Sequence, residues 1–212
     1  MKRAVVFGGG QIKNYSLLPY EPSDDDYFIC ADSGILHCES MGLCADVWVG
    51  DFDSCDFKNC VLLPAAKKAE VISLNPQKDC SDVEYALDYA VRQGFDTLIL
   101  IGGMGTRFDH TLSNLYLAEK YYNSGVSLTV INESNIINFV KNQTFSICKT
   151  RYKYISVLPL EDSVVSTEGL FYEISREPLY RNSTRSISNE MTGNCATITL
   201  HSGSAFVIES MD

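Results

Sequence analysis

The stretch that decides the fold reads Val47-Trp48-Val49-Gly50-Asp51-Phe52-Asp53-Ser54. Its first three residues are apolar and predict the end of a buried strand, and the glycine lets the backbone turn there. Asp51 and Asp53 then stand at the carboxyl end of that strand. Two carboxylates so close repel each other unless a cation lies between them. A surface turn is the competing interpretation, because Asp and Gly are also common turn residues.

Length and charge limit the possible functions. The chain has 212 residues, enough for one large core or two modest ones, and a formal net charge of −10. This charge argues against a nucleic-acid partner, because phosphate backbones are bound by clustered Lys and Arg. An anionic substrate would need a divalent metal or a few well-placed cationic side chains. No apolar run reaches membrane-spanning length or resembles a signal peptide, so we expect a cytoplasmic protein without a membrane partner.

The cysteine pattern fits the same compartment. Eight cysteines occur, none of them in a Cys-x-x-Cys pair and none beside histidines at zinc-ligand spacing. We therefore expect reduced thiols.

In the first part of the chain, predicted strands alternate with predicted helices, which indicates a mostly parallel, doubly wound α/β domain. The run Thr97–Ile101 is uninterrupted and apolar, which is typical of an interior parallel strand. From about residue 137 the runs become short and alternating, with Gly and Pro between them, and they predict an antiparallel, jelly-roll-like β-sandwich. The predicted domains are 1–138 and 139–212. The strands expected in the second are Thr144–Cys148, Tyr152–Leu158, Val164–Thr167, Leu170–Ile174, Arg185–Ser188, Cys195–Leu200 and Ser204–Ser210.

Further polar residues follow the other predicted strands of the first domain. Open α/β sheets bind ligands at the carboxyl ends of their strands, so we expect these residues on one rim. Many acids with few bases on such a rim indicate Mg²⁺ bridging a polyphosphate. The residues are Asp32, Lys78, Asp79, Asp82, Arg107, Asp109 and His110.

Several of these residues have structural alternatives. Asp32 could be a helix N-cap, and Ser81 or Asp79 could cap the helix that contains Asp82. The Gly8-Gly9-Gly10 run either admits a phosphate close to the backbone or forms a simple tight turn. His37 has no recognisable partner in the sequence and is predicted to be structural.

Taken in order, three motifs resemble the signature motifs of the thiamine pyrophosphokinase family. They are Gly50-Asp51-Phe52-Asp53-Ser54, Lys78-Asp79-Cys80-Ser81-Asp82 and Thr106-Arg107-Phe108-Asp109-His110. In the second domain, Gly169-Leu170-Phe171-Tyr172 and Ser186-Ile187-Ser188-Asn189-Glu190 extend the resemblance over nearly the whole chain. Any one motif is weak, but the ordered set is specific.

The resemblance implies an activity and a division of labour. The pyrophosphoryl group of ATP would pass to the hydroxyl of thiamine, giving thiamine diphosphate and AMP, with Mg²⁺ as cofactor and a homodimer as the assembly. Residues 1–138 would form the catalytic, ATP- and Mg²⁺-binding domain, and residues 139–212 the thiamine-binding domain. It implies Asp51, Asp53 and Asp82 as catalytic and metal-binding residues, Asp32, Lys78, Asp79, Arg107, Asp109 and His110 as ATP or phosphate contacts, and Tyr172, Ser188 and Asn189 as thiamine contacts.

Two other functions remain open at this point. One is a Mg²⁺-dependent nucleotide pyrophosphatase that uses water in place of thiamine. The other is a non-catalytic dimer that binds thiamine or a nucleotide.

Overall fold

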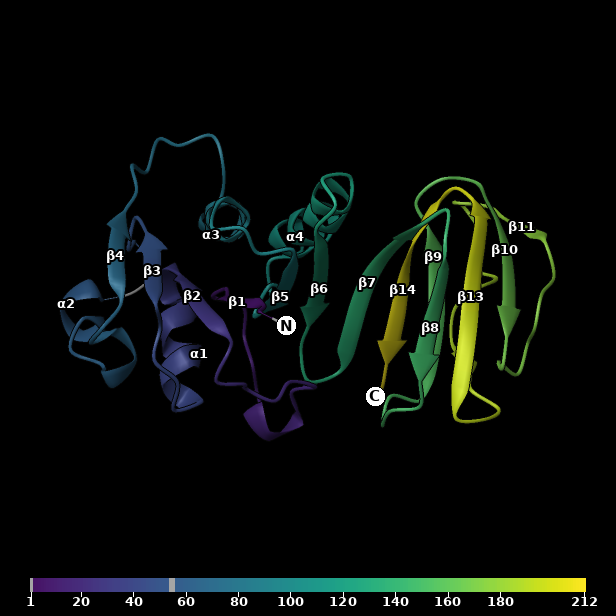
Figure 1. Ribbon diagram of the computed structural model, residues 1–212, viewed down its shortest axis with the longest axis horizontal. Coiled ribbons are helices and arrows are strands. Elements are labelled where there is room, and N and C mark those ends of the chain that lie inside the picture. The colour runs from purple at the N-terminus through teal and green to yellow at the C-terminus, as the bar shows by residue number, and fades with distance from the viewer. Residues whose placement is uncertain (1, 54–55) are drawn as a thin grey trace. The chain divides into compact units, whose positions relative to one another are not determined.

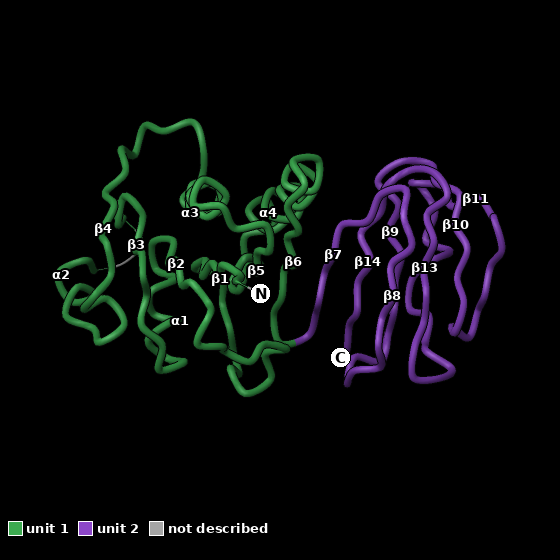
Figure 2. Tube along the Cα trace, in the orientation of Figure 1, with its two compact units in different colours: residues 1–133 green, residues 134–212 purple. Residues whose placement is uncertain are grey.

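The computed structural model describes residues 2–53 and 56–212, so Ser54 of the deciding stretch lies outside the described residues. The chain divides into two compact units, residues 1–133 and 134–212 (Figure 2). The sequence predicted this boundary after residue 138. The division comes earlier because strand β7, Asn135–Lys141, pairs along its whole length with β14, Ser204–Ser210, at the end of the chain.

Unit 1 is built on six parallel strands in the order β4-β3-β2-β1-β5-β6 (Figure 1). The strands are β1 Ala4–Phe7, β2 Tyr27–Ala31, β3 Val47–Gly50, β4 Glu70–Ser73, β5 Thr97–Ile101 and β6 Ser127–Ile131. The apolar side chains of β1, β2, β3, β5 and β6 form the core, where Phe7, Trp48 and Leu100 are fully buried, whereas the edge strand β4 is mostly exposed. The predicted interior position of Thr97–Ile101 is confirmed, because β5 lies between β1 and β6.

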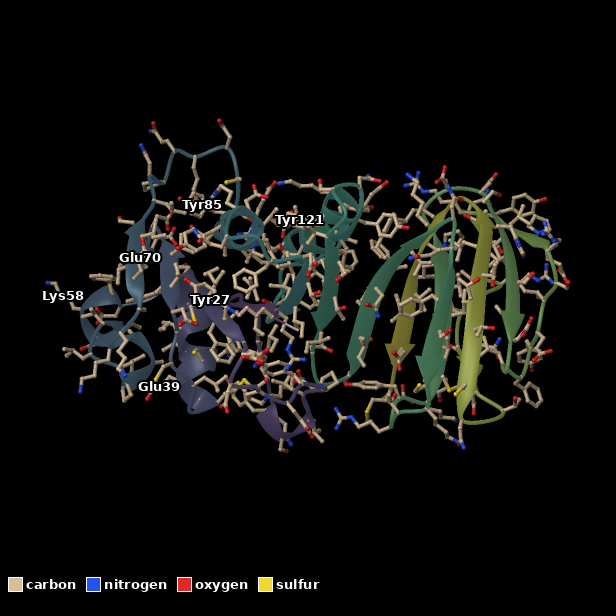
Figure 3. All side chains as sticks on the ribbon, viewed as in Figure 1. Tyr27, Glu39, Lys58, Glu70, Tyr85 and Tyr121 are labelled. Atoms are coloured by element: carbon tan, nitrogen blue, oxygen red, sulfur yellow. The ribbon has the colours of Figure 1, made fainter. Side chains whose placement is uncertain are left out.

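Helices cover both faces of this sheet. The α-helices are α1 Ile35–Ser40, α2 Phe57–Cys60, α3 Asp82–Arg92 and α4 Phe108–Tyr122, and the 3₁₀ turns are Tyr15–Leu17, Asp32–Gly34 and Pro64–Ala66. The connection from β2 through α1 to β3 runs along the sheet in one direction, and the connections through α3 and α4 run in the other. Because such crossovers are right-handed, α1 lies on one face of the sheet and α3 and α4 lie on the opposite face (Figure 1). Tyr121 of α4 donates a hydrogen bond of 2.8 Å to Asp88 of α3 and fixes that helix pair (Figure 3). Within the described parts of the chain, no helix is long and apolar enough to cross a membrane.

Unit 2 is the predicted antiparallel β-sandwich. One sheet has the order β12-β9-β14-β7 and the other β11-β10-β13-β8. Apolar side chains from both sheets form one core, among them Val157 and Val207 from the first and Val165 and Ile198 from the second. The remaining strands are β8 Thr144–Cys148, β9 Tyr154–Pro159, β10 Ser163–Glu168, β11 Glu177–Leu179, β12 Asn189–Glu190 and β13 Cys195–Ser202.

Two of the predicted strands in unit 2 were wrong. Leu170–Ile174 makes only a single bridge, between Leu170 and Met191, and then leaves the sheet as a loop. Arg185–Ser188 is also a loop. Ser188 adopts a positive φ of 57°, which an extended strand does not permit. Alternating apolar residues were therefore a misleading signal here, because in the folded unit they line a cavity.

Candidate functional site

The strand order of unit 1 reverses between β1 and β5, and in open α/β sheets this switch point is where ligands bind. Glycine-rich loops follow both strands and lie against each other. Gly8 N–H donates to the Ile101 carbonyl and Gly10 N–H to the Gly102 carbonyl, each over 2.8 Å. A Cβ on Gly10 would lie 2.3 Å from the Met104 carbonyl oxygen, so this approach requires glycine. The Gly8–Gly10 run is thus a packed element of the switch point.

His37 fixes the first of these loops. Its Nε2 lies 2.8 Å from the Gly10 carbonyl oxygen, and its Nδ1 lies 2.7 Å from the Tyr15 hydroxyl. A carbonyl can only accept, so Nε2 carries the proton and Nδ1 accepts from Tyr15. Burial lowers the pKa of His37 and favours this neutral form. The predicted structural role of His37 agrees with this geometry, but the sequence does not show that His37 meets Gly10 and Tyr15.

Asp32 and Asp51 follow the neighbouring strands β2 and β3. A Cβ on Gly50 would lie 3.1 Å from the Asp32 Cα atom, so glycine allows the two strand ends to approach closely. The buried Trp48 donates an indole hydrogen bond of 2.8 Å to the Asp32 carbonyl. Asp32 has a φ of 50° and is largely buried, and the N-cap positions of the 3₁₀ turn and of α1 are Ala31 and Gly34, so Asp32 is not the N-cap of either.

The loop that follows β3 is anchored by aromatic packing. The ring of Phe52 packs edge-on against Trp48 at 4.7 Å between centroids, and Phe57 stacks on the same indole at 5.1 Å. Phe52 has a positive φ of 60°, which the packing offsets. The packing of Phe52 thus anchors the residue that separates Asp51 from Asp53 just after the end of β3.

Asp32, Asp51 and Asp53 form what we call the acidic trio. One carboxylate oxygen from each lies within 4.8 Å of the other two. The Asp53 N–H donates to Asp51 Oδ1 over 3.3 Å, which holds the two-residue turn. Three carboxylates at this spacing can share one divalent cation, and hard oxygen ligands suit Mg²⁺.

Lys78 supplies the positive charge beside the trio. Its Nζ atom lies 3.0 Å from Asp51 Oδ2 and 3.2 Å from Asp82 Oδ1. Asp82 is in this position because Ser81 caps α3, accepting from the Glu84 N–H over 3.1 Å. Of the two predicted caps, Ser81 is therefore the one used.

The pKa values in this cluster shift in opposite directions. The hydrogen bond from Lys78 lowers the pKa of Asp51. Burial raises the pKa of Asp82, and the nearby ammonium offsets this only in part. Burial alone would lower the pKa of Lys78, but its pairing with both carboxylates outweighs burial and raises it. At neutral pH Lys78 is therefore charged and shared between two acids.

The remaining predicted residues of unit 1 lie outside this ion-paired group. Arg107 Nη2 lies 2.7 Å from Asp109 Oδ2 at the start of α4, and about two thirds of each side chain is exposed. The hydrogen bond between them lowers the pKa of Asp109. His110 and Asp79 are exposed as well. Asn114, which the sequence did not mark, donates 2.7 Å to the Gly103 carbonyl and holds the glycine loop to α4.

Unit 2 contains a cavity of about 530 Å³. Apolar side chains line it, and Thr167, Glu173, Arg185, Ser186 and Asn189 add polar groups. Such a hollow, apolar with a few polar groups, is typical of small-molecule sites. Arg185, which was not predicted, is held by an ion pair with Glu177 at 2.5 Å.

The predicted residues of unit 2 are arranged around this cavity in different ways. Tyr172 and Asn189 line it, and Tyr172 keeps 70% of its surface exposed. The Asn189 amide donates 2.8 Å to the Tyr172 carbonyl and accepts 3.0 Å from its N–H, so it fixes the backbone of the aromatic loop. Ser188 donates its N–H to the Ser156 hydroxyl over 2.9 Å and does not belong to the cavity lining.

A doubly wound unit with carboxylates at its strand ends, followed by a β-sandwich with an apolar cavity, defines a class of two-unit ligand-binding α/β proteins. Two family models match the two units separately. The catalytic domain of thiamin pyrophosphokinase matches residues 20–130, and its vitamin B1 binding domain matches residues 134–205. The chain belongs to the thiamin pyrophosphokinase family.

Known proteins show the same likeness over the full chain. The thiamine pyrophosphokinase of Bacillus subtilis is 26% identical over 215 residues, with both chains covered completely. The crystal structure of the Bacillus subtilis protein has a TM-score of 0.89 with this chain at 26% identity, again over all of both chains. That of the Geobacillus thermodenitrificans protein has a TM-score of 0.85 at 28% identity, over 100% of this chain and 98% of that one.

Proposed function

We propose that the protein transfers the pyrophosphoryl group of ATP to the hydroxyl of thiamine and releases thiamine diphosphate and AMP. The observation that carries the proposal is the match of a catalytic and a vitamin B1 binding model to the two units in order. The acidic trio and the cavity supply the two kinds of site that this reaction requires. Transfer of this kind depends on positioning and charge neutralisation more than on covalent catalysis.

The acidic trio suits Mg²⁺. This ion usually takes one or two protein carboxylates together with substrate phosphates, and the trio offers three oxygens within 4.8 Å. We assign Asp51 and Asp53 as ligands, with Asp32 completing the set. Asp82, expected as a ligand from the family resemblance, is assigned to hold Lys78 beside them. Bound Mg²⁺ neutralises phosphate charge and polarises phosphoryl oxygens.

The nucleotide is proposed to bind at the switch point. The glycine loops after β1 and β5 pack against each other there, and phosphate groups would lie at the strand ends beside them. Lys78 would exchange its carboxylate partners for phosphate oxygens and so place positive charge on the polyphosphate. Arg107 offers a planar donor pair once it leaves Asp109, and Asp79, Asp109 and His110 belong to the same proposed ATP contacts.

Thiamine is proposed to bind in unit 2. The exposed ring of Tyr172 at the cavity offers a stacking surface for an aromatic ligand. Asn189 positions that ring through its two backbone hydrogen bonds, and Ser188 shapes the same loop through Ser156. These roles assign recognition of the organic substrate to unit 2 and phosphate chemistry to unit 1.

Incubation of the full chain with ATP, Mg²⁺ and thiamine tests the reaction. Thiamine diphosphate and AMP in equal amounts, both dependent on the metal, are the expected products. AMP with pyrophosphate and no thiamine diphosphate would instead identify the nucleotide pyrophosphatase. Ligand binding without AMP would identify the non-catalytic alternative.

A homodimer belongs to the same proposal. On α4, Phe108, Leu112 and Tyr116 stand at positions i, i+4 and i+8 and are 70%, 37% and 49% exposed. An apolar stripe of this kind is typical of surfaces that a partner covers. Sedimentation equilibrium should give the mass of two chains, and the mass of one chain at assay concentrations would contradict the proposal.

A further inference from the structure

Two cysteines lie opposite each other on neighbouring strands of unit 2. Cys148 is the last residue of β8 and Cys195 is the first residue of β13. The two strands are antiparallel, and their register pairs Cys148 directly with Cys195. The two thiols are 47 residues apart in the sequence, so this pairing appears only when the sheet is formed.

The hydrogen-bond pattern shows which kind of pair this is. Lys149 N–H donates to the Asn194 carbonyl over 2.8 Å, one residue beyond the cysteines on each strand. In an antiparallel ladder, hydrogen-bonded and non-hydrogen-bonded pairs alternate, so Cys148 and Cys195 form a non-hydrogen-bonded pair. The pair Thr144 and Thr199, four residues further along each strand, is of the same kind, and its hydroxyls lie 2.9 Å apart. Side chains on this face therefore meet across the strands.

The spacing of such pairs matches that of a disulfide. Opposite residues at non-hydrogen-bonded positions have Cα atoms about 4.5 Å apart. Disulfide-bonded cysteines span Cα distances of about 4.4–6.8 Å. Both thiols are free and both residues are exposed, whereas the neighbours Ile147 and Ala196 are buried in the core. The pair thus faces solvent, where an oxidant can reach it.

We propose that Cys148 and Cys195 are a redox-modification site that a hydroperoxide converts to an intramolecular cross-strand disulfide. In the first step one thiolate displaces water or an alcohol from the hydroperoxide and becomes a sulfenic acid. In the second step the other thiol attacks that sulfur, the S–S bond forms, and the sulfenic oxygen leaves as water. In sum, two thiols and one hydroperoxide give one disulfide, one water and one further water or alcohol. A dithiol reductant reverses the change by thiol–disulfide exchange.

The site adjoins the loop that carries Tyr172. A Cβ on Gly169 would lie 2.4 Å from the Cys195 carbonyl oxygen, and the Thr192 N–H donates 3.0 Å to the Gly169 carbonyl. Oxidation therefore modifies the strand end on which this loop packs. The chemistry itself is independent of the proposed reaction, because it needs only the folded sheet.

Treatment of the full chain with hydrogen peroxide, followed by alkylation and peptide mass spectrometry, tests the proposal. We expect the chain to lose two hydrogen atoms and to yield one peptide pair linked through Cys148 and Cys195. The rate should be independent of protein concentration. Dithiothreitol should restore both thiols.

Three variants separate the pair from general cysteine oxidation. Cys148→Ser and Cys195→Ser should each abolish the linked peptides and leave a sulfenic acid on the remaining cysteine. Cys44→Ser removes another exposed thiol and should leave the link unchanged. Oxidation of Cys44 without any Cys148–Cys195 link in the wild-type chain would overturn the proposal, as would a link that forms only between chains.

Discussion

The acidic trio of unit 1 and the cavity of unit 2 are built in opposite ways. In unit 1, backbones touch at glycines and charged side chains are paired, with Lys78 Nζ at 3.0 Å from Asp51 and 3.2 Å from Asp82. In unit 2, the cavity is lined mainly by apolar side chains, and its two aromatic residues, Phe171 and Tyr172, are 68% and 70% exposed.

This difference supports the proposed division of the reaction, with phosphate chemistry in unit 1 and recognition of thiamine in unit 2. Polyphosphate recognition needs fixed charges whose positions change little, and such charges need a rigid backbone. An aromatic organic ligand is bound largely by surface contact, so an exposed ring beside an apolar cavity is sufficient. Substitutions should therefore affect turnover in unit 1 and substrate affinity in unit 2.

The largest effect is expected from Asp51→Asn. This change keeps the shape of the side chain but removes the charge that faces Lys78 and would face the proposed Mg²⁺, so turnover should fall about a hundred- to a thousandfold. Formation of thiamine diphosphate measures it, with thermal unfolding as a check that the fold is intact. Asp24→Asn removes an exposed acid elsewhere in unit 1 and should leave turnover unchanged. If the two variants were equally active, Asp51 would not be part of the catalytic site.

The next effect concerns backbone contact in unit 1. A Cβ on Gly34 would lie 1.9 Å from the Phe7 carbonyl oxygen, so Gly34→Ala forces the strand end and the 3₁₀ turn apart. We expect a loss of about 3 kcal/mol in the free energy of unfolding. Gly193→Ala in unit 2 meets nothing within 4 Å and should change it by less than about 0.5 kcal/mol. Chemical denaturation measures both, and similar losses in the two variants would contradict the close backbone contact inferred at Gly34.

A smaller effect is expected from Tyr172→Ala. Loss of the stacking surface should raise the KM for thiamine about tenfold, which corresponds to about 1.4 kcal/mol, and leave the KM for ATP unchanged. Tyr180→Ala is the matched control, because this exposed tyrosine of unit 2 is not part of the cavity lining. A shift in the KM for ATP instead would show that the two units do not divide the substrates as proposed.

The smallest effect is a pH dependence of stability. Lys78 lowers the pKa of Asp51 in the folded chain, so the pair stabilises the fold above the ordinary carboxyl pKa of about 4. This stabilisation is lost as the pH falls through the lowered folded value. Lys78→Met should therefore cost about 1 kcal/mol at neutral pH and progressively less in acid. Urea denaturation between neutral and acidic pH measures it, with Lys68→Met as an exposed control. If the difference in the free energy of unfolding between the unchanged chain and Lys78→Met did not vary with pH, the ion pair would not be the cause of that difference.

Local patterns in the sequence predicted much of the fold. The uninterrupted apolar run Thr97–Ile101 predicted an interior strand because both faces of that strand are covered by helices. The short run Ser204–Ser210, which follows Gly203, predicted a sandwich strand, and β14 has those bounds. The apolar approach to Gly50 predicted a strand end with two acids beyond it, and Asp51 and Asp53 lie there.

The parts that were missed depend on contacts between distant segments. Asn114 and Arg185 carry no local signal, because their partners Gly103 and Glu177 become neighbours only in the folded units. The strand predicted over Leu170–Ile174 failed for a related reason. Its apolar residues line the cavity, and after the single bridge from Leu170 to Met191 the Tyr172 backbone bonds the Asn189 side chain, so no ladder continues.

The single tryptophan of the chain has a further use. Trp48 is fully buried, donates its indole N–H to the carbonyl of Asp32, and packs against Phe52, which separates Asp51 from Asp53. Its fluorescence therefore comes from one place in the molecule, directly behind the acidic trio. The chain carries its own optical reporter, and a titration with Mg²⁺ or nucleotide can be followed by emission without any added label.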